Sequence, residues 1–500
     1  MKNSLKMVQP LQIMDSGLDL DSAKQYNEPI WKIWKHKRYI ISILAFFGFM
    51  NVYALRTNLN IAIVDITAYK NITLEDGTTI LKREFEWDST IRGYVLSSFY
   101  YGYVLTQILG GYLAVQLGGA KVFGFGIAAT SFFTLITPWI AKTNVYLLIG
   151  VRTIEGAFEG VTYPAINEVW SHWAPPTEKS RLVSIGISGG YFGAVFAMPI
   201  CSVIATTYDW ESIFYVFGTL GLIWYLIWII VVRDNPSNDS RIDQKERVYI
   251  NESIKAVKSD SKAIVPWLKI LTSPGVIANT ICLSCEGWGF TTMLTYLPQM
   301  MKSLLGFDLT KASILAGLPY LVTSINVQLG GQIADFLFRR KYMTTTNVRR
   351  SLIITGFLSQ AIFILIASYW ISPLGTPLCL IMGVGMGGIA LSAMSINPLD
   401  LAPKFASVIF GINNTMAAIP GIVSPIITGY LVTDPTSITQ WRIVFYISSG
   451  FYFLGVIVSF FFTTGTRQPW AEIDKNVIED LNSANCRVEN KNSQQEDNNL

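Results

Sequence analysis

The 500-residue sequence contains little charge, two histidines and five cysteines. Charged residues make up 14% of it, against about 25% in ordinary soluble proteins. Cys282 and Cys285 have C-x-x-C spacing but lie in an apolar run without a neighbouring His, so helix packing explains them better than a metal does. The net charge of +4 is spread over short segments, which argues against nucleic acid binding. The composition excludes an ordinary soluble enzyme, and no metal or cofactor is expected.

The sequence contains long apolar runs. They recur between Tyr39 and Phe462, and each is roughly 18 to 25 residues long, enough for a helix to cross about 30 Å of hydrocarbon. We predict an all-α membrane protein with twelve transmembrane helices, at residues 39–65, 91–114, 121–141, 145–169, 184–206, 211–232, 275–300, 313–334, 351–371, 374–397, 405–431 and 441–463.

Basic residues indicate which loops face the cytoplasm, since short cytoplasmic loops retain Lys and Arg. They gather before the first predicted span, after the sixth and after the eighth: Lys32, Lys35, Lys37, Arg38; Arg233, Arg241, Lys245, Arg247, Lys255, Lys258, Lys262; Arg339, Arg340, Lys341, Arg349 and Arg350. The loops after the fifth and ninth spans contain neither residue. Both termini are therefore predicted to be cytoplasmic, and the sequon at Asn71 lies in a non-cytoplasmic loop, where it predicts glycosylation.

This topology divides the chain into five parts. A cytoplasmic tail at 1–38 precedes a six-helix bundle at 39–232. A charged cytoplasmic linker at 233–274, with an amphipathic helix from Gln244 to Val257, leads to a second bundle at 275–465. The tail at 466–500 is rich in Asn, Gln, Ser and acidic residues, a composition typical of disorder.

The two predicted bundles repeat each other. Trp87-Asp88-Ser89-Thr90 begins a run that closes with Gly110-Gly111, and Phe307-Asp308-Leu309-Thr310 begins another that closes with Gly330-Gly331. Both pairs have the same offset (308 − 88 = 220; 330 − 110 = 220). Two similar halves related by an axis along the membrane normal are how the major facilitator class of secondary transporters is built.

The second copy continues into a possible gate. Asp335, Arg339 and Arg340 follow its glycine pair, and they resemble the major facilitator loop signature in which acidic and basic residues latch a cytoplasmic gate. The first copy has Lys121 but no acid at the equivalent of Asp335, so the latch should be asymmetric. The alternative is that these charges only set topology.

A few charged residues fall inside the predicted spans, where each costs at least about 2.5–3.5 kcal/mol on insertion scales. Arg152, Glu155 and Glu159 are spaced i, i+3 and i+7 in the fourth span, which places them within about 60° of each other on a helix. Because this stripe carries one positive and two negative groups, one glutamate is expected to take up a proton when the surroundings change. The alternative is a static Arg152–Glu155 ion pair that joins helices.

Two further ionisable residues lie deep in other spans. Arg56 of the first span presents a guanidinium fork suited to a carboxylate or a phosphate. Glu286 of the seventh span is either an additional coupling site or the partner of Arg56 across the two halves.

Uncharged polar residues extend this candidate site. Tyr163 lies one turn beyond Glu159 and is expected in the cavity. Asn413 and Asn414 lie mid-membrane in span eleven, where they either hydrogen-bond the substrate from the second half or form a structural bond between helices. Glycines and prolines of spans five and eleven permit close helix packing and bending.

Three segments resemble the anion:cation symporter family of the major facilitator superfamily, which includes sialin, the vesicular glutamate transporters and the type I sodium-phosphate cotransporters. They are Arg56-Thr57-Asn58-Leu59-Asn60-Ile61-Ala62-Ile63-Val64-Asp65, Glu159-Gly160-Val161-Thr162-Tyr163-Pro164-Ala165, and Asn397-Pro398-Leu399-Asp400-Leu401-Ala402-Pro403. The resemblance covers roughly residues 39–470. It is strongest toward the sialin-like and inorganic phosphate cotransporter branch.

The resemblance implies roles for the intramembrane charges. The family's anion-binding arginines match Arg56 and Arg152, and the proton-coupling acids of sialin match Glu155 and Glu159. Vesicular glutamate transporters carry Gln at the position of Glu155 and Arg at that of Glu286, so this chain resembles sialin more. It departs from the family at Asn167, where the pattern usually has His.

We therefore expect a secondary active transporter, and not an enzyme, that moves a small organic or inorganic anion by alternating access, coupled to H⁺ or Na⁺. A sodium-dependent phosphate cotransporter is the alternative within the family, and a non-transporting anion receptor is the alternative from another class. Its partners are the anion and the lipid bilayer, and it is expected to work as a monomer. The plasma membrane and a lysosomal or vesicular membrane both fit the sequence.

Overall fold

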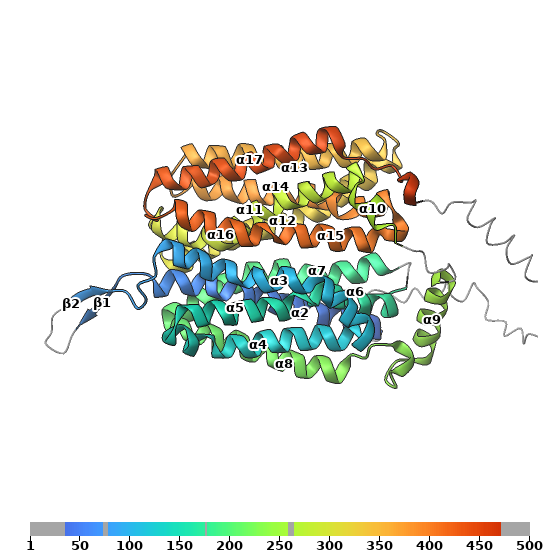
Figure 1. The fold of residues 1–500 in the computed structure, drawn as a ribbon, viewed down its shortest axis with the longest axis horizontal. Helices are drawn as coiled ribbons and strands as arrows, with labels where there is room; N and C mark the ends of the chain where they lie inside the picture. The colour runs from blue at the N-terminus through green and yellow to red at the C-terminus, as the bar shows by residue number, and fades with distance from the viewer. Residues whose placement is uncertain (1–35, 74–78, 176–177, 259–264, 472–500) are drawn as a thin grey trace, which may run out of the picture.

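The computed structural model describes residues 36–73, 79–175, 178–258 and 265–471. Two helical bundles lie side by side with their helices along a common direction (Figure 1). The N-terminal bundle comprises α2 (Lys37–Ile66), α3 (Ser89–Leu117), α4 (Gly119–Thr143), α5 (Val145–Gly160), α6 (Thr162–Trp173), α7 (Lys179–Thr207) and α8 (Trp210–Val231). The C-terminal bundle comprises α11 (Pro274–Ser303), α12 (Leu309–Arg339), α13 (Thr345–Tyr369), α14 (Gly375–Leu401), α15 (Ala406–Ala418), α16 (Pro420–Leu431) and α17 (Ile438–Phe462).

Each predicted span coincides with one helix or with two consecutive helices. In the described ranges, nine helical segments are long and apolar enough to cross a membrane, with most of α15 and α16 counted together. The pair α5–α6 and the helices α3 and α11 complete the twelve. Two of these three additional spans carry charges of the candidate site. Arg152, Glu155 and Glu159 lie on α5, and Glu286 lies on α11. The fold is the predicted twelve-helix, two-bundle arrangement.

Two spans predicted as continuous helices are divided. Pro164 has no N–H to donate to the carbonyl of Gly160, and its ring crowds that carbonyl, so α5 ends at Gly160 and α6 begins at Thr162. Pro420 likewise stands at the first position of α16, and Ile419 alone separates it from the end of α15. At that position its missing N–H costs no helical hydrogen bond.

One short element in the first loop was not predicted. Strands β1 (Lys70–Thr73) and β2 (Thr79–Lys82) form an antiparallel hairpin in which Lys70 pairs with Lys82. It projects beyond one end of the bundles, which we call the hairpin end (Figure 1). Asn71, the predicted glycosylation site, lies on β1, and its side chain is outside the described part of the structure.

The helices separate an apolar exterior from a mixed interior. Large apolar side chains are exposed on the outer faces of α4, α8 and α17, among them Trp139, Leu226, Ile230, Phe460 and Phe461. Most of the residues at the candidate site are buried, including Arg56, Arg152, Glu155 and Glu159. This inverted distribution is that of a protein with lipid as its outer solvent.

The internal repeat extends to its helix caps. Asp88 Oδ1 accepts a hydrogen bond from the Ile91 amide at 2.7 Å at the start of α3, and Asp308 Oδ1 accepts one from the Lys311 amide at 2.9 Å at the start of α12. Both are N-caps of the preferred type. Helices α4 and α13 are also equal in length, at 25 residues.

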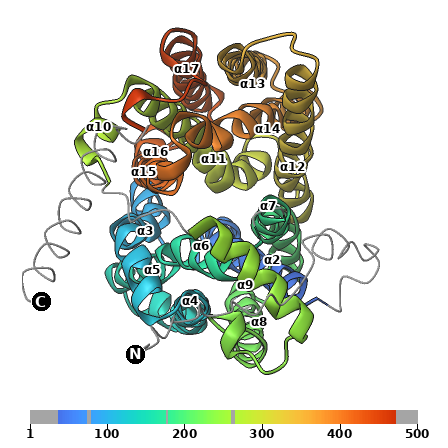
Figure 2. The same cartoon turned by 90° about the vertical axis from the view of Figure 1, so that its right-hand side faces the viewer.

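The two bundles meet along α3 with α16 and along α7 with α12 (Figure 2). At the hairpin end, the hydroxyls of Tyr94 and Tyr430 lie 2.7 Å apart, and Asn60 Nδ2 donates to the Leu294 carbonyl at 3.3 Å. Ser202 Oγ donates to Thr310 Oγ1 at 3.4 Å. Hydrogen bonds therefore join the halves at this end.

At the opposite end, a cavity of about 400 Å³ lies between α7 and α12 and is lined by Arg181, Ser184, Ile185, Ser188 and Gln328. Helix α9 (Gln244–Lys258) lies beyond the bundles at this end (Figure 1), which we call the linker end. The short α10 (Trp267–Leu271) leads from the linker into α11. Hydrogen bonds thus join the halves at the hairpin end, and a cavity lies between α7 and α12 at the linker end.

Charge pairs attach α9 to the N-terminal bundle. Glu246 of α9 accepts hydrogen bonds from the Lys37 amide at 2.9 Å and from Arg38 Nη1 at 2.9 Å. Arg38 also donates from Nε to Glu178 Oε2 at 2.9 Å, in the loop before α7. Burial by itself would raise the pKa of Glu178, but the hydrogen bonds and the charge of Arg38 outweigh it and hold that pKa below its usual range.

Candidate functional site

Two ion pairs lie buried in the N-terminal bundle. Arg56, from α2, donates to Glu159 Oε1, from α5, with its Nη2 at 2.5 Å and its Nε at 3.1 Å. The relative exposure of the two side chains is 8% and 1%. Because only one carboxylate oxygen receives both donors, Glu159 Oε2 remains buried without a partner in the described structure. A buried oxygen without a partner can bind a proton or accept a hydrogen bond from a ligand.

Aromatic rings surround the Arg56 guanidinium. Its central carbon lies 4.9 Å from the ring centroid of Tyr53, 5.0 Å from Phe99 and 4.9 Å from Tyr103. Distances under about 6 Å allow cation–π attraction. The rings therefore hold the cation in place while one carboxylate neutralises it.

The second pair lies within α5 and is tied to α4. Arg152 Nη1 donates to Glu155 Oε2 at 2.5 Å. The other carboxylate oxygen accepts hydrogen bonds from Thr137 Oγ1 at 3.0 Å and from Thr134 Oγ1 at 3.3 Å. Arg152 Nε is buried without a partner in the part of the chain that the structure describes. Glu155 is thus fully engaged, whereas its arginine retains one free donor.

The charges at this site are balanced. The sequence predicted one stripe on α5 with an excess negative charge, and Arg56 of α2 adds a positive charge to it by pairing with Glu159. The Arg152 guanidinium also lies 5.4 Å from the Phe99 centroid, so Phe99 contacts both arginines. The site therefore holds two ion pairs, and one aromatic ring lies near both guanidinium groups.

Glu286 lies elsewhere, in the C-terminal bundle. The alternative that it pairs with Arg56 was wrong, because Arg56 bonds Glu159. Glu286 Oε1 instead accepts a hydrogen bond from Gln360 Nε2 of α13 at 3.3 Å. The structure thus keeps this carboxylate apart from both arginines.

The predicted polar residues of the cavity have protein partners. Thr280 Oγ1 donates to Asn413 Oδ1 at 2.6 Å between α11 and α15. Asn414 Nδ2 donates to Gln107 Oε1 at 2.9 Å, which links the second bundle to α3 of the first. Tyr163 packs with its ring centroid 4.7 Å from that of Phe49. The bond to Asn413 is the structural alternative foreseen from the sequence, whereas Asn414 reaches across the halves.

The predicted gate is described only in part. The side chains of Asp335 and Arg339 are outside the described part of the structure. Arg340 is exposed, with its guanidinium 5.8 Å from the ring centroid of Phe336. In the first copy, the loop between α3 and α4 has no acidic residue of its own. Asp234, which follows α8, lies beside that loop, and its Oδ1 accepts a hydrogen bond from the Ala120 amide at 2.8 Å.

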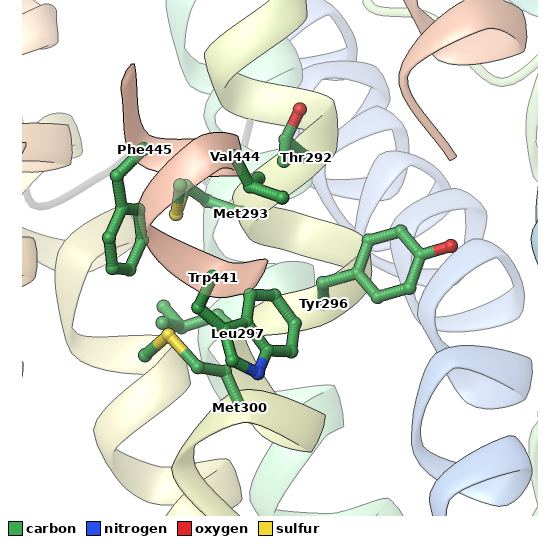
Figure 3. Close-up of a pocket in the computed structure, with 8 residues that line it drawn as sticks. All are labelled: Thr292, Met293, Tyr296, Leu297, Met300, Trp441, Val444 and Phe445. Atoms are coloured by element: carbon green, nitrogen blue, oxygen red, sulfur yellow. The ribbon is translucent and has the colours of Figure 1, made fainter. Parts of the chain in front are cut away.

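Two other features are not sites. The pocket in Figure 3, between α11 and α17, has a volume of about 10 Å³ and is lined mainly by apolar side chains such as Met293 and Phe445. That volume holds at most one water. Cys282 and Cys285 are buried thiols, and among the described residues no group of three or more His, Cys, Asp or Glu side chains could hold a metal ion.

With this geometry in place, the comparisons identify the family. The model of the Major Facilitator Superfamily matches residues 40–425. The chain belongs to the major facilitator superfamily. Sialin from Homo sapiens is 40% identical over 451 residues, which cover 87% of this chain and 90% of sialin. Vesicular glutamate transporter 1 from Bos taurus is 39% identical over 442 residues, which cover 87% of this chain and 78% of that protein.

Solved structures agree on the major facilitator fold. A bacterial homologue of the human lysosomal transporter Spinster has a TM-score of 0.66 at 12% identity, over 85% of this chain and 96% of that one. The xylose transporter XylE from E. coli has a TM-score of 0.63 at 12% identity, again over 85% and 96%.

These relatives place the chain in the anion:cation symporter branch of the major facilitator superfamily. It is a multi-pass membrane protein and a secondary transporter, not an enzyme. The sequence had identified the charged residues of its site but not Tyr53, Phe99 and Tyr103, which surround Arg56. Phe99 and Tyr103 are spaced i, i+4 on α3, whereas Tyr53 lies on α2 itself, so only the packing of α3 against α2 brings the three rings together around Arg56.

Proposed function

We propose that this protein moves a small organic anion together with protons, and that Arg56 and Arg152 bind the anion. The observation that carries the proposal is that a glutamate of α5 neutralises each buried arginine. An anion can take over a guanidinium only if the glutamate gives up its charge, because a second carboxylate beside the first would be repelled in a low dielectric. Protonation of the glutamate and binding of the anion are therefore linked.

Arg56 and Glu159 are suited to be the exchanging pair. Glu159 has an unpartnered buried oxygen ready to hold a proton, and it contacts Arg56 through one oxygen only. After protonation, the guanidinium fork can turn its two N–H groups to a substrate carboxylate. The aromatic rings beside it favour an organic anion over a bare phosphate, because they offer an apolar surface against which the carbon skeleton of the anion can pack.

Arg152 and Glu155 form the more strongly held pair. Thr134 and Thr137 stabilise the Glu155 carboxylate, while the free Nε of Arg152 can donate to the anion. We assign Glu155 to proton coupling together with Glu159. Tyr163, Asn413 and Asn414 support the site through helix contacts.

The conformation suggests how the site is reached. We infer that the linker end is cytoplasmic, as the basic clusters favour, so the cavity beside Arg181 opens to the cytoplasm. Transport then requires the halves to part at the hairpin end and close at the linker end, where Asp335, Arg339 and Arg340 would form the latch. Asn71 would carry a glycan on the far side.

The relatives support the class of substrate and the compartment. One is named a vesicular glutamate transporter and another sialin. We propose a sialin-like anion such as a sugar acid or an acidic amino acid, and a lysosomal or vesicular membrane. The family resemblance further implies that Glu155 and Glu286 stand where vesicular glutamate transporters carry other residues, which favours the sialin-like substrate.

The test is uptake into proteoliposomes. Labelled sialic acid, glutamate and phosphate are offered under an imposed proton gradient and then under an imposed sodium gradient, to wild type, Glu159→Gln and Glu155→Gln. We expect proton-driven accumulation of one organic anion. Both variants should lose accumulation but keep gradient-free exchange, since Gln mimics the protonated acid.

Other results would point elsewhere. Sodium-driven phosphate uptake that both variants retain would replace this proposal with a phosphate cotransporter. Saturable binding of an anion with neither exchange nor accumulation would indicate a receptor.

A further inference from the structure

The C-terminal bundle buries a carboxyl group that the proposed anion site does not use. Glu286 is 5% exposed, and its Oε1 accepts one hydrogen bond, from Gln360 Nε2 at 3.3 Å. Its other oxygen, Oε2, is buried and has no partner among the described residues. A buried carboxylate normally binds several donors or a cation.

Three more oxygens around this carboxyl group are also buried and unpartnered in the described structure: Gln360 Oε1 of α13, the Tyr320 hydroxyl of α12 and the Tyr452 hydroxyl of α17. Their residues are at most 1% exposed. Gly387 of α14 leaves room for the pair, since a Cβ there would lie 2.7 Å from Glu286 Oε1 and would strike Gln360 Nε2. Three helices, α12, α13 and α17, therefore place unsatisfied groups beside Glu286 of α11, and a glycine of α14 leaves the space for them.

The internal repeat gives this place a counterpart in the first bundle. Helices α4 and α13 have equal length and start 226 residues apart (345 − 119 = 226), so Gln360 corresponds to Thr134 (134 + 226 = 360). Thr134 donates to the carboxylate of Glu155, and Gln360 donates to that of Glu286. Each half thus has one buried carboxyl group that accepts a hydrogen bond from the third spanning helix of that half, which is α4 in the first half and α13 in the second.

The two carboxyl groups differ in their charge partners. Glu155 has Arg152 at 2.5 Å. Among the described residues Glu286 has no ion pair, and the titratable groups that face it include Tyr191 on α7, Tyr320 on α12, Tyr452 on α17 and Cys285 on α11 itself. They are phenols and a thiol, which carry no positive charge at neutral pH. The negative charge of Glu286 must therefore be balanced by something that enters.

We propose that Glu286, Gln360, Tyr320 and Tyr452 form a second coupling site, which binds one monovalent cation, H⁺ or Na⁺. A proton adds to the carboxylate and makes it a neutral acid, and deprotonation returns the proton to the aqueous side that is open. Na⁺ would instead be ligated by the carboxylate, amide and phenol oxygens. The role in coupling rests on the proposed transport function, whereas the binding of the cation does not.

Cation binding is tested on the purified full-length protein in nanodiscs by infrared difference spectroscopy between acidic and alkaline pH. A protonated buried carboxyl group gives its own C=O stretching band, whose loss on alkalinisation reports deprotonation. Because Glu155 and Glu159 can contribute bands of their own, we expect one component of this band to be present in wild type and in Glu155→Gln and to be absent from Glu286→Gln. An unchanged band in Glu286→Gln overturns the proposal.

Two further measurements identify the cation and keep the test valid if Glu286→Gln does not fold. If Na⁺ competes for the site, sodium will shift the loss of the band to lower pH, and if the site accepts only protons, potassium and sodium will give the same titration. Tyr452→Phe removes only a hydroxyl that has no partner, so it should fold. It is expected to shift the titration of the band, and an unshifted titration removes Tyr452 from the site.

Transport then separates this inference from the proposed function. Glu286→Gln should keep gradient-free exchange of the anion and accumulate less of it per unit of gradient than wild type. Loss of exchange in Arg56→Lys with normal cation binding at Glu286 would leave the second site intact. Normal accumulation by Glu286→Gln would show that the site binds a cation without coupling it.

Discussion

At the residue scale, the arginine of the first span determines what the site can bind. Arg56 makes two hydrogen bonds to Glu159 through a planar fork and lies among aromatic rings. A lysine keeps the charge but offers a single point donor and packs poorly on rings.

We therefore predict that Arg56→Lys weakens anion binding about 10- to 100-fold, as expected for the loss of charge-assisted hydrogen bonds worth about 1.5–3 kcal/mol. The measurement is the half-saturating concentration of anion exchange in proteoliposomes. Arg241→Lys is the matched control, because Arg241 is exposed and lies in the linker, away from the candidate site and the latch. Equal affinities for wild type and Arg56→Lys would contradict the assignment of Arg56.

A second residue-scale prediction concerns pH at the linker end. The pKa of Glu178 lies below its ordinary value of 4.5 because the hydrogen bonds and charge of Arg38 outweigh burial. A carboxyl group with a depressed pKa stabilises the fold above its unfolded pKa and loses that contribution as the pH falls through its folded pKa.

Wild type should accordingly lose thermal stability as the pH drops below about 4.5, and Glu178→Gln should lose less over the same range. Thermal unfolding in detergent, followed by tryptophan fluorescence across that pH range, measures the difference. Parallel curves for the two proteins would show that Glu178 does not contribute.

At the element scale, small residues determine how closely the halves approach. A Cβ on Gly429 of α16 would lie 2.6 Å from the Ser89 carbonyl oxygen and 3.2 Å from the Gly93 Cα of α3. These are backbone atoms, which cannot relieve the clash by changing rotamer as a flexible side chain can. The crossing of α3 and α16 at the hairpin end therefore depends on glycine.

Gly429→Ala is predicted to destabilise this crossing by about 1–3 kcal/mol, the usual cost of overpacking. Gly411→Ala on α15 is the control, since a Cβ there meets nothing within 4 Å and alanine favours the helix. The readout is labelling by an impermeant maleimide of a cysteine placed at Asn60, which lies between the halves. Gly429→Ala should label faster than Gly411→Ala, and equal rates would contradict the prediction.

At the scale of the whole molecule, the two bundles are joined at one end and separated at the other. Alternating access requires the joined end to open. Tyr94 and Tyr430 face each other there from α3 and α16, with ring centroids 6.2 Å apart.

A reversible thiol cross-linker between Tyr94→Cys and Tyr430→Cys should abolish anion exchange, and reductant should restore it. A third cysteine at Ser188, in the cavity of the linker end, should remain accessible throughout. Each single cysteine variant treated with the same reagent is the control. Full exchange by the cross-linked protein would show that this end does not have to open.

Much of the architecture followed from the sequence alone. Apolar runs of membrane length located the twelve spans because each must satisfy its backbone hydrogen bonds within itself. The equal offsets of the two glycine pairs predicted two related halves. The match to the Major Facilitator Superfamily agrees with that prediction. Residues such as Arg56 and Glu286 were conspicuous because charge is rare in an apolar run.

Tertiary structure alone decided which of these charges are partners. The spacing along α5 suggested a stripe, but Glu159 pairs with Arg56 of α2, and Glu286 lies against Gln360 of another helix. Helical periodicity relates residues within one turn or two of each other, whereas these pairs join residues 103 and 74 positions apart. Packing against the other helices determines the direction in which each helix turns its polar face. That packing neutralises Arg56 and leaves Glu286 without a countercharge among the residues that the structure describes.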